Sequence, residues 1–168
     1  MIRRLHPADA AAFRDIRLEG LRLHPAAFGA SHDDENAQPL DWFAARIADH
    51  AVFGAFSGAE NLEGVAGLMV PAARKTRHKG VLWGMYVRES ARGSGLAAAL
   101  LGRVLEHAAS VVEEVKLEVS PDNRAAMRLY EAAGFGVYAR EPRALKIGDA
   151  YHDSLFMTLR LTRPDDAH

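Results

Sequence analysis

The sequence predicts one α/β (α+β) domain built on a mixed, mostly antiparallel sheet. Three observations predict this class. At 168 residues, of which 49% are apolar and 26% charged, the chain has the size and composition of a single globular domain over residues 1–168. Strand-like segments recur in closely spaced pairs, which is typical of antiparallel hairpins. One amphipathic segment, Gly95–Ala109, lies between two strand-like segments and indicates a crossover that makes these two strands parallel.

We expect six to seven strands and about four helices, in the order β-α-α-β-β-β-α-β-α-β-β. The first third of the chain supplies a strand and two helices. Pro7 suits a first helical turn, and His24-Pro25 stops the helix that follows. The expected bounds are Ile2–Leu5 for the strand, Pro7 to about Leu23 for the first helix, an irregular stretch with an acidic cluster over 26–39, and a shorter helix around Trp42–Ile47.

The remaining elements follow from a change, after Ala51, in the spacing of the apolar residues along the chain. Leu96, Leu100 and Val104 share one face of a helix, whereas Val115, Leu117 and Val119 alternate as in a strand. The expected strands are Val52–Phe56, Leu62–Val70, Val81–Val87, Val115–Val119, Phe135–Leu145 and Tyr151–Leu161, and the expected helices are Gly95–Ala109 and about Asn123–Ala133, which Gly134 ends.

Composition excludes several classes of function. A net charge of −1 without any block of like charge leaves no broad surface for nucleic acid or an anionic membrane. The absence of cysteine excludes disulfides, thiolate catalysis and cysteine-bound zinc. The N-terminus lacks a signal-peptide pattern, and the longest apolar run, Leu96–Leu101, is too short to cross a bilayer. We therefore expect a cytoplasmic protein that binds no metal, nucleic acid or membrane.

A glycine turn, Arg92-Gly93-Ser94-Gly95-Leu96-Ala97, lies between an expected strand and an expected helix. Backbone N–H groups at a helix start, together with the helix dipole, form an anion site, and glycine lets a phosphate approach the main chain. The turn therefore favours a phosphate-bearing ligand, although a tight turn that needs glycine only for its dihedral angles is an equally simple interpretation.

Two better-known phosphate motifs compete for this turn. Gly93-x-Gly95-x-x-Ala98 formally matches a dinucleotide-binding fingerprint, and Glu118 follows at a suitable distance. A dinucleotide fold, however, places the turn after its first strand and repeats the βαβ unit, whereas here antiparallel strands precede it and one crossover is expected. The nucleoside-triphosphate loop is excluded because no Gly-Lys-Ser/Thr follows the glycines.

A second constellation, Asn123-x-x-Ala126-x-x-Leu129-Tyr130 followed by Gly134-Phe135, places an amide and a phenol on one expected helix face. Together the two motifs resemble the GNAT family of N-acetyltransferases, whose turn has the form Arg/Gln-x-x-Gly-x-Gly/Ala. The resemblance covers about residues 81–135 strongly, and the order of strands outside this range also fits the family.

The resemblance implies acetyl-CoA as cofactor, with its diphosphate on the glycine turn and its pantetheine arm beside the preceding strand. The implied cofactor-binding residues are Met85, Tyr86, Val87, Arg92, Gly93, Ser94, Gly95, Leu96, Ala97, Asn123, Ala126 and Tyr130. We expect Tyr130 to be the general acid, because a phenol near the sulfur can protonate the departing thiolate. Core packing is the alternative role of this tyrosine.

The base and the acceptor are less well defined by the sequence. Glu118, His78 and Glu35 are candidate bases, and a water chain is an alternative to each. Phe28, Trp83, Tyr151 and Glu35 are candidate acceptor-binding residues, although the aromatic ones also suit a core. We expect a primary amine of a small molecule as acceptor. A protein N-terminus or lysine, a non-catalytic acyl-CoA-binding module, and a homodimer are further hypotheses.

Overall fold

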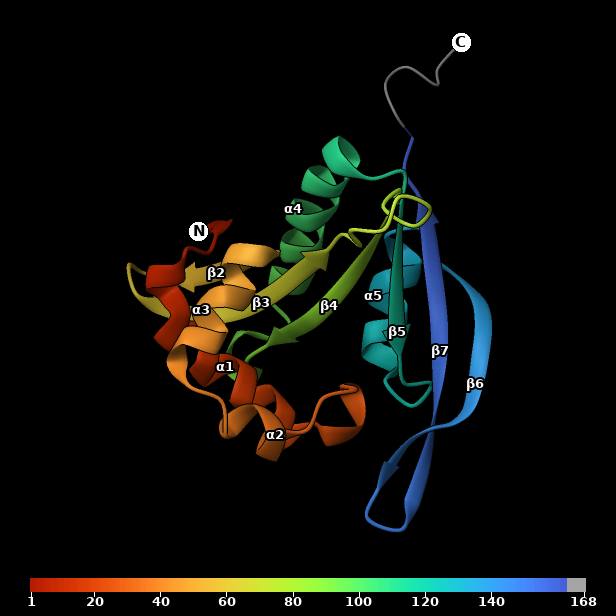
Figure 1. Ribbon diagram of the computed structural model, residues 1–168, viewed down its shortest axis with the longest axis horizontal. Helices are drawn as coiled ribbons and strands as arrows, with labels where there is room; N and C mark the ends of the chain where they lie inside the picture. Colours follow the sequence, from red (N-terminus) through yellow and green to blue (C-terminus); the bar gives the residue numbers. More distant parts are fainter. Residues whose placement is uncertain (163–168) are drawn as a thin grey trace.

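The computed structural model describes residues 1–162 and contains a seven-stranded mixed sheet with helices on both faces (Figure 1). The strands are β1 (Ile2–Arg4), β2 (Ala51–Ser57), β3 (Asn61–Met69), β4 (Lys79–Val87), β5 (Glu114–Val119), β6 (Gly136–Ile147) and β7 (Ala150–Arg160), in the spatial order β1-β2-β3-β4-β5-β7-β6. The helices are α1 (Ala10–Leu23), α2 (His32–Asn36), α3 (Leu40–Asp49), α4 (Leu96–Val111) and α5 (Arg124–Ala132). The predicted mixed sheet is confirmed.

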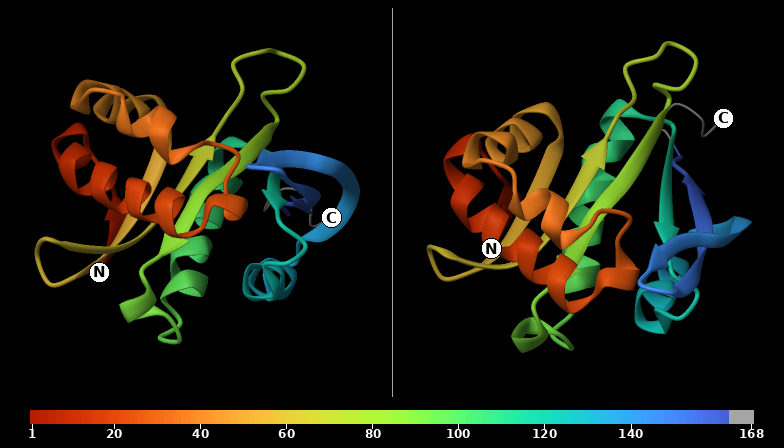
Figure 2. Two further views of the ribbon diagram at one scale, coloured as in Figure 1. Left: turned by 90° about the horizontal axis from the view of Figure 1, so that it is seen from below. Right: turned by 60° about the horizontal axis from the view of Figure 1, so that its bottom comes forward.

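Two apolar clusters lie on opposite faces of this sheet. Helices α1 and α3 cover one face, where Phe13, Ile16 and Phe43 are buried. Helices α4 and α5 cover the other, where Leu100, Val104 and Tyr130 are buried. Figure 2 shows the two helical layers on either side of the strands.

One parallel contact interrupts the antiparallel order, and it is short. The crossover through α4 makes β4 and β5 parallel, as predicted, but only Lys79–Val81 pairs with Glu114–Lys116. Beyond these three pairs both strands continue without pairing to each other, β4 to Val87 and β5 to Val119. The edge of β4 that faces β5 is thus free of a strand partner from Leu82 onward.

A β-bulge bends β4 where it leaves β5. Tyr86 pairs with Val65 and Trp83 with Gly67, so two residues of β4, Gly84 and Met85, lie opposite a single residue of β3. Gly84 has a φ of +64°, a left-handed conformation that favours glycine. The bulge changes the direction of the β4 side chains on either side of it, and Trp83 is the last residue before it.

The stretch over 26–39, predicted to be irregular, contains a helix. Residues 32–36 form α2, and the Ser31 hydroxyl caps it by accepting a hydrogen bond of 3.1 Å from the Asp34 N–H. The prediction of about four helices therefore missed one. The acidic cluster did not predict this helix, because acidic residues are favoured in the first turn of a helix but are also common in solvated loops.

The longest helix is α4, with 16 residues, and it is clearly amphipathic. Leu100, Leu101, Val104 and Ala108 are buried, whereas residues on the opposite side, such as Gly102, are exposed. Within residues 1–162 no helix combines the length and the apolar character needed to cross a membrane.

Gly102→Ala should stabilise the protein by about 1 kcal/mol, because glycine in a helix interior costs backbone entropy that alanine does not. A Cβ at Gly102 would meet nothing within 4 Å. Urea unfolding measures the change. Gly134→Ala is the control of opposite sign, because Gly134 has a φ of +102°. A loss of stability in Gly102→Ala would contradict the open space around this position.

Candidate active site

The glycine turn follows β4 through a short 3₁₀ turn, Glu89–Ala91, and leads directly into α4. Gly93 and Gly95 have φ values of +75° and +79°, and Gly95 is the N-cap of α4. None of the turn and cap hydrogen bonds found within residues 1–162 uses the backbone N–H of Gly93, Ser94 or Gly95. Exposed backbone donors therefore gather at the positive end of a 16-residue helix.

The space in front of this turn is open. A Cβ at Gly93 or Gly95 would meet no atom within 4 Å, so these glycines serve backbone conformation and leave room for a ligand. Arg92 holds the turn, since its Nε donates to the Val87 carbonyl at 3.2 Å. Its Nη2 lies 3.1 Å from the His24 Nε2. The turn thus fits the diphosphate of coenzyme A.

The unpaired edge of β4 connects this turn to the bulge. Met85 packs against the cluster beneath α4 and α5, whereas Tyr86 packs toward α1. The Tyr86 hydroxyl donates to Glu19 Oε1 at 2.9 Å, and burial, followed by this hydrogen bond, raises its pKa to about 12. The Tyr86 side chain is thus engaged by Glu19, and the predicted contact with the cofactor is left to the backbone of Tyr86.

Helix α5 supplies the predicted amide and phenol. Asn123 lies just before the helix and caps it, because its Oδ1 accepts from the Ala126 N–H at 3.2 Å. The Asn123 Nδ2 takes no part in this cap. Tyr130 is buried, packs edge-on against Phe135 at 5.9 Å between ring centroids, and has its pKa raised to about 12 by burial. Burial therefore keeps the phenol in its protonated form.

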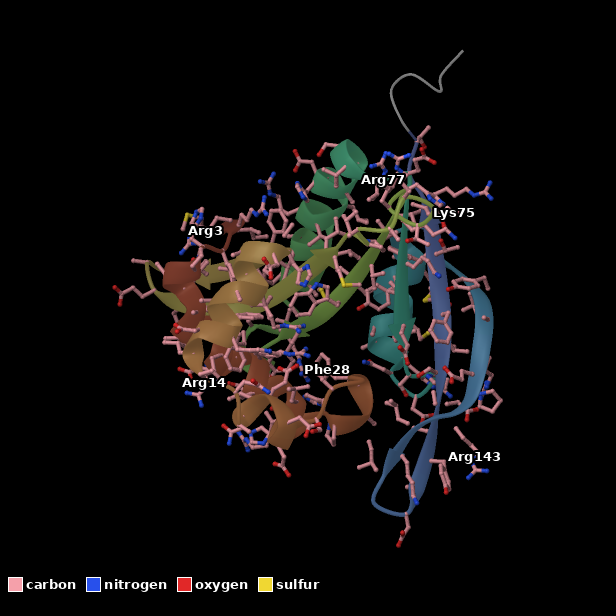
Figure 3. All side chains as sticks on the ribbon, in the orientation of Figure 1. Arg3, Arg14, Phe28, Lys75, Arg77 and Arg143 are labelled. Atoms are coloured by element: carbon pink, nitrogen blue, oxygen red, sulfur yellow. The ribbon has the colours of Figure 1, made fainter. Side chains whose placement is uncertain are left out.

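A cavity of about 300 Å³ lies where β4 and β5 have separated. It is lined by Arg17, Ala26, Ala27, Phe28, Gly29, Arg46, His50, Met69, Val81, Leu82, Trp83, Gly84, Glu118, Val119, Ser120, Leu145 and Ser154. The cavity brings together Phe28, Trp83 and Glu118, three of the residues predicted for the acceptor site or the base. Figure 3 labels Phe28, which lies between the helical layer and strands β5–β7.

Glu35, a predicted base and acceptor residue, is held in a buried ion pair. Arg17 donates to both of its carboxylate oxygens, each at 2.9 Å, and both residues are less than a tenth exposed. Both carboxylate oxygens of Glu35 are thus engaged by Arg17, and Glu35 does not line the cavity. Its carboxylate instead positions the Arg17 guanidinium, whose Nη1 lies 3.4 Å from the position that a Cβ on Gly84 would occupy.

Three basic residues of the cavity wall were not predicted from the sequence: Arg17, Arg46 and His50. Burial lowers the pKa of His50, and the nearby Arg46 lowers it further, whereas Asp49 opposes the shift, so the neutral imidazole is favoured. The His50 ring packs edge-on against Trp83 at 5.8 Å. The signal that could have identified Arg17 is its position on the apolar face of the first helix, beside Ile16.

Four residues predicted for catalysis or acceptor binding do not line the cavity: Tyr130 and Glu35, described above, and also His78 and Tyr151. His78 precedes β4 at its paired end, away from the glycine turn, and its carbonyl accepts hydrogen bonds from the N–H groups of Glu113 and Glu114. Tyr151 is about half exposed on the β6–β7 hairpin, where the Arg143 guanidinium lies 3.9 Å from its ring centroid. The structure thus corrects the placement of Tyr151 in the acceptor pocket.

Comparison with known proteins agrees with this geometry. The model of the acetyltransferase (GNAT) family matches residues 15–135. A putative acetyltransferase from Acinetobacter baylyi superposes with a TM-score of 0.85 at 18% identity, covering 100% of this chain and 96% of its own. A putative acetyltransferase from Salmonella typhimurium, solved with its cofactor acetyl-CoA, superposes with a TM-score of 0.80 at 25% identity, covering 97% of this chain and 94% of its own.

A ribosomal-protein-alanine N-acetyltransferase from Brucella melitensis is similar in fold as well. Its TM-score is 0.80 at 23% identity, and the superposition covers 96% of this chain and 99% of the other. No curated protein matches the sequence itself. The solved structures therefore show the fold, and the match to the family model shows the family.

Proposed function

Since the chain belongs to the acetyltransferase (GNAT) family and is an acetyl-CoA-dependent N-acetyltransferase, we propose that it acetylates the primary amine of a small molecule. One observation supports this acceptor class. The cavity of about 300 Å³ is lined by the separated parts of β4 and β5, so an amine inside it lies at the gap that the cofactor arm is expected to enter. That volume suits a small ligand.

Acetyl-CoA, when bound, supplies an acetyl group activated as a thioester. The exposed N–H groups of residues 93–95 would hold the diphosphate, and the free edge of β4 would orient the arm. Glu118 or His50 would take a proton from the ammonium form of the acceptor and so supply a free amine. Tyr130 would give its proton to the departing sulfur and be reprotonated by the second proton that the acetylated nitrogen loses.

A protein N-terminus is the second candidate acceptor, favoured by the similarity in fold to the Brucella melitensis enzyme. A peptide needs a groove that is open at both ends. Leu145 and Ser154 of the β6–β7 hairpin line the cavity, and a second pocket shares Leu145 with it, so the two acceptor classes are distinguished by experiment.

The proposal is tested by a thiol-release assay with acetyl-CoA and two sets of acceptors, small amines and peptides with free N-termini. Acetylation of small amines with catalytic efficiency at least tenfold above that of the peptides is expected. Preference for the peptides would replace the first candidate with the second. Coenzyme A binding without thiol release for any acceptor would identify a non-catalytic acyl-CoA-binding module.

Tyr130→Phe should lower kcat about a hundredfold while the Kd for coenzyme A changes less than about threefold. The ring and its packing against Phe135 remain, and only the proton donor is lost. Steady-state kinetics and calorimetric titration with coenzyme A measure the two quantities.

Tyr138→Phe is the matched control, because Tyr138 is about half exposed on β6 and is expected to leave both quantities unchanged. Equal loss of turnover and of cofactor affinity in Tyr130→Phe would contradict the role of general acid and support a packing role.

A further inference from the structure

One charged group on the cavity wall has no counter-charge of its own. Arg46, on α3, lies between two indole rings, with its guanidinium carbon 4.7 Å from the Trp42 centroid and 4.5 Å from that of Trp83. Its Nε is buried without a hydrogen-bond acceptor. No ion pair within residues 1–162 involves this side chain, in contrast to Arg17, which is paired with Glu35.

A partly buried guanidinium without a partner is costly, because removing it from water is not offset by a carboxylate. Burial indeed lowers the pKa of Arg46, an effect that Glu35 opposes and Arg17 reinforces. The two rings flank the guanidinium, and Arg46 is one of the residues that line the cavity. A planar, pre-oriented guanidinium is well suited to a carboxylate, which accepts two parallel hydrogen bonds.

The other charges of the cavity define the rest of the ligand. The charge of Arg17 is matched by Glu35, and burial lowers the pKa of His50, which favours its neutral form. Glu118, exposed on β5, then remains as the negative group of the opposite wall. The cavity thus presents one unmatched cation on α3 and one carboxylate on β5.

We propose that the acceptor is a zwitterion of the amino-acid type, whose carboxylate binds Arg46 and whose amine lies toward Glu118. This inference rests on the proposed function, and it adds the chemical class of the acceptor. A single unmatched positive charge corresponds to one carboxylate, and a cavity of about 300 Å³ favours a free small molecule over the end of a protein chain. Arg46 is then a specificity-determining residue.

The test compares L-amino acids with their own α-carboxamides as acceptors, using wild type, Arg46→Gln and Arg46→Lys. Each pair differs only in the carboxylate. We expect kcat/KM to favour the acid of at least one pair by tenfold or more. In Arg46→Gln the KM of that acid should rise about ten- to hundredfold, and the KM of its carboxamide by less than about threefold. Arg46→Lys should recover part of the loss.

Arg14→Gln is the matched control. The Arg14 guanidinium lies 5.8 Å from the Phe43 centroid, and its Nε is likewise buried without an acceptor, yet Arg14 does not line the cavity. Figure 3 labels Arg14 on the outer side of the helical layer. Its replacement should leave the ratio of acid to carboxamide unchanged.

Binding is measured independently of turnover by tryptophan fluorescence. The protein has two tryptophans, Trp42 and Trp83, and both flank Arg46. Titration of the L-amino acids in the presence of coenzyme A should change the emission of wild type and of Arg14→Gln. In Arg46→Gln the midpoint of the same titration should move to a concentration about ten- to hundredfold higher, and the midpoint for the carboxamides should differ by less than about threefold between wild type and Arg46→Gln.

Two results would overturn the inference: carboxamides acetylated as well as their acids, or no emission change with any amino acid. Titration with coenzyme A separates this failure from a failure of the proposed function. If coenzyme A binds and amines without a carboxylate are acetylated equally by wild type and Arg46→Gln, the zwitterion alone is wrong. If no amine is acetylated at all, the proposed function fails with it.

Discussion

Gly95→Asp should weaken coenzyme A binding by about a thousandfold, or ~4 kcal/mol, while the protein remains folded. The substitution places a carboxylate at the N-terminus of α4, where the exposed N–H groups of residues 93–95 are expected to hold a diphosphate. The carboxylate and the diphosphate are both negative, and like charges in close proximity repel each other. Aspartate tolerates a left-handed conformation and is favoured as an N-cap, so the fold should persist.

Calorimetric titration with coenzyme A measures the change, and two variants control it. Gly95→Asn has nearly the same shape without the charge, and it should lose about tenfold or less. Gly102→Asp places the same charge on the exposed side of α4, where a Cβ meets nothing within 4 Å, and it should bind normally. Equal affinities for Gly95→Asp and wild type would show that the diphosphate binds elsewhere.

Glu35→Ala should lower the free energy of unfolding by about 3–5 kcal/mol, because it leaves the buried Arg17 without its carboxylate. That is a large part of the ~5–15 kcal/mol that stabilises a typical domain. Chemical denaturation monitored by circular dichroism measures the loss.

Asp34→Ala is the control, since Asp34 is the exposed neighbour on the same helix and should change stability by less than ~0.5 kcal/mol. Replacing both partners with methionine should recover much of the stability lost in Glu35→Ala. Equal effects of Glu35→Ala and Asp34→Ala would mean that the pair contributes little.

Features encoded by neighbouring residues could be predicted from the sequence. The hairpins, the crossover through α4 and the glycine turn all depend on local period and on glycine positions, and the structure contains each of them. Gly84, an isolated glycine within the expected strand Val81–Val87, is a further local sign, because such a glycine is typical of a bulge.

Features that depend on distant residues could not be read in this way. Arg17 and Glu35 are 18 positions apart, and nothing in the local pattern of either indicates a buried pair. Arg46 reads as an ordinary exposed helical arginine until the fold places Trp83 against it. Tyr151 suited an aromatic pocket by type, but its place on the hairpin puts it elsewhere.

The short β4–β5 pairing has a consequence for the mechanics of the molecule. Among the described strands, it is the only ladder that joins β1–β4 to β5–β7, and it contains three residue pairs at one end. The sheet therefore consists of two halves that meet along a narrow seam. A ligand lying between the unpaired portions bridges these halves and, by mass action, makes their separation less favourable.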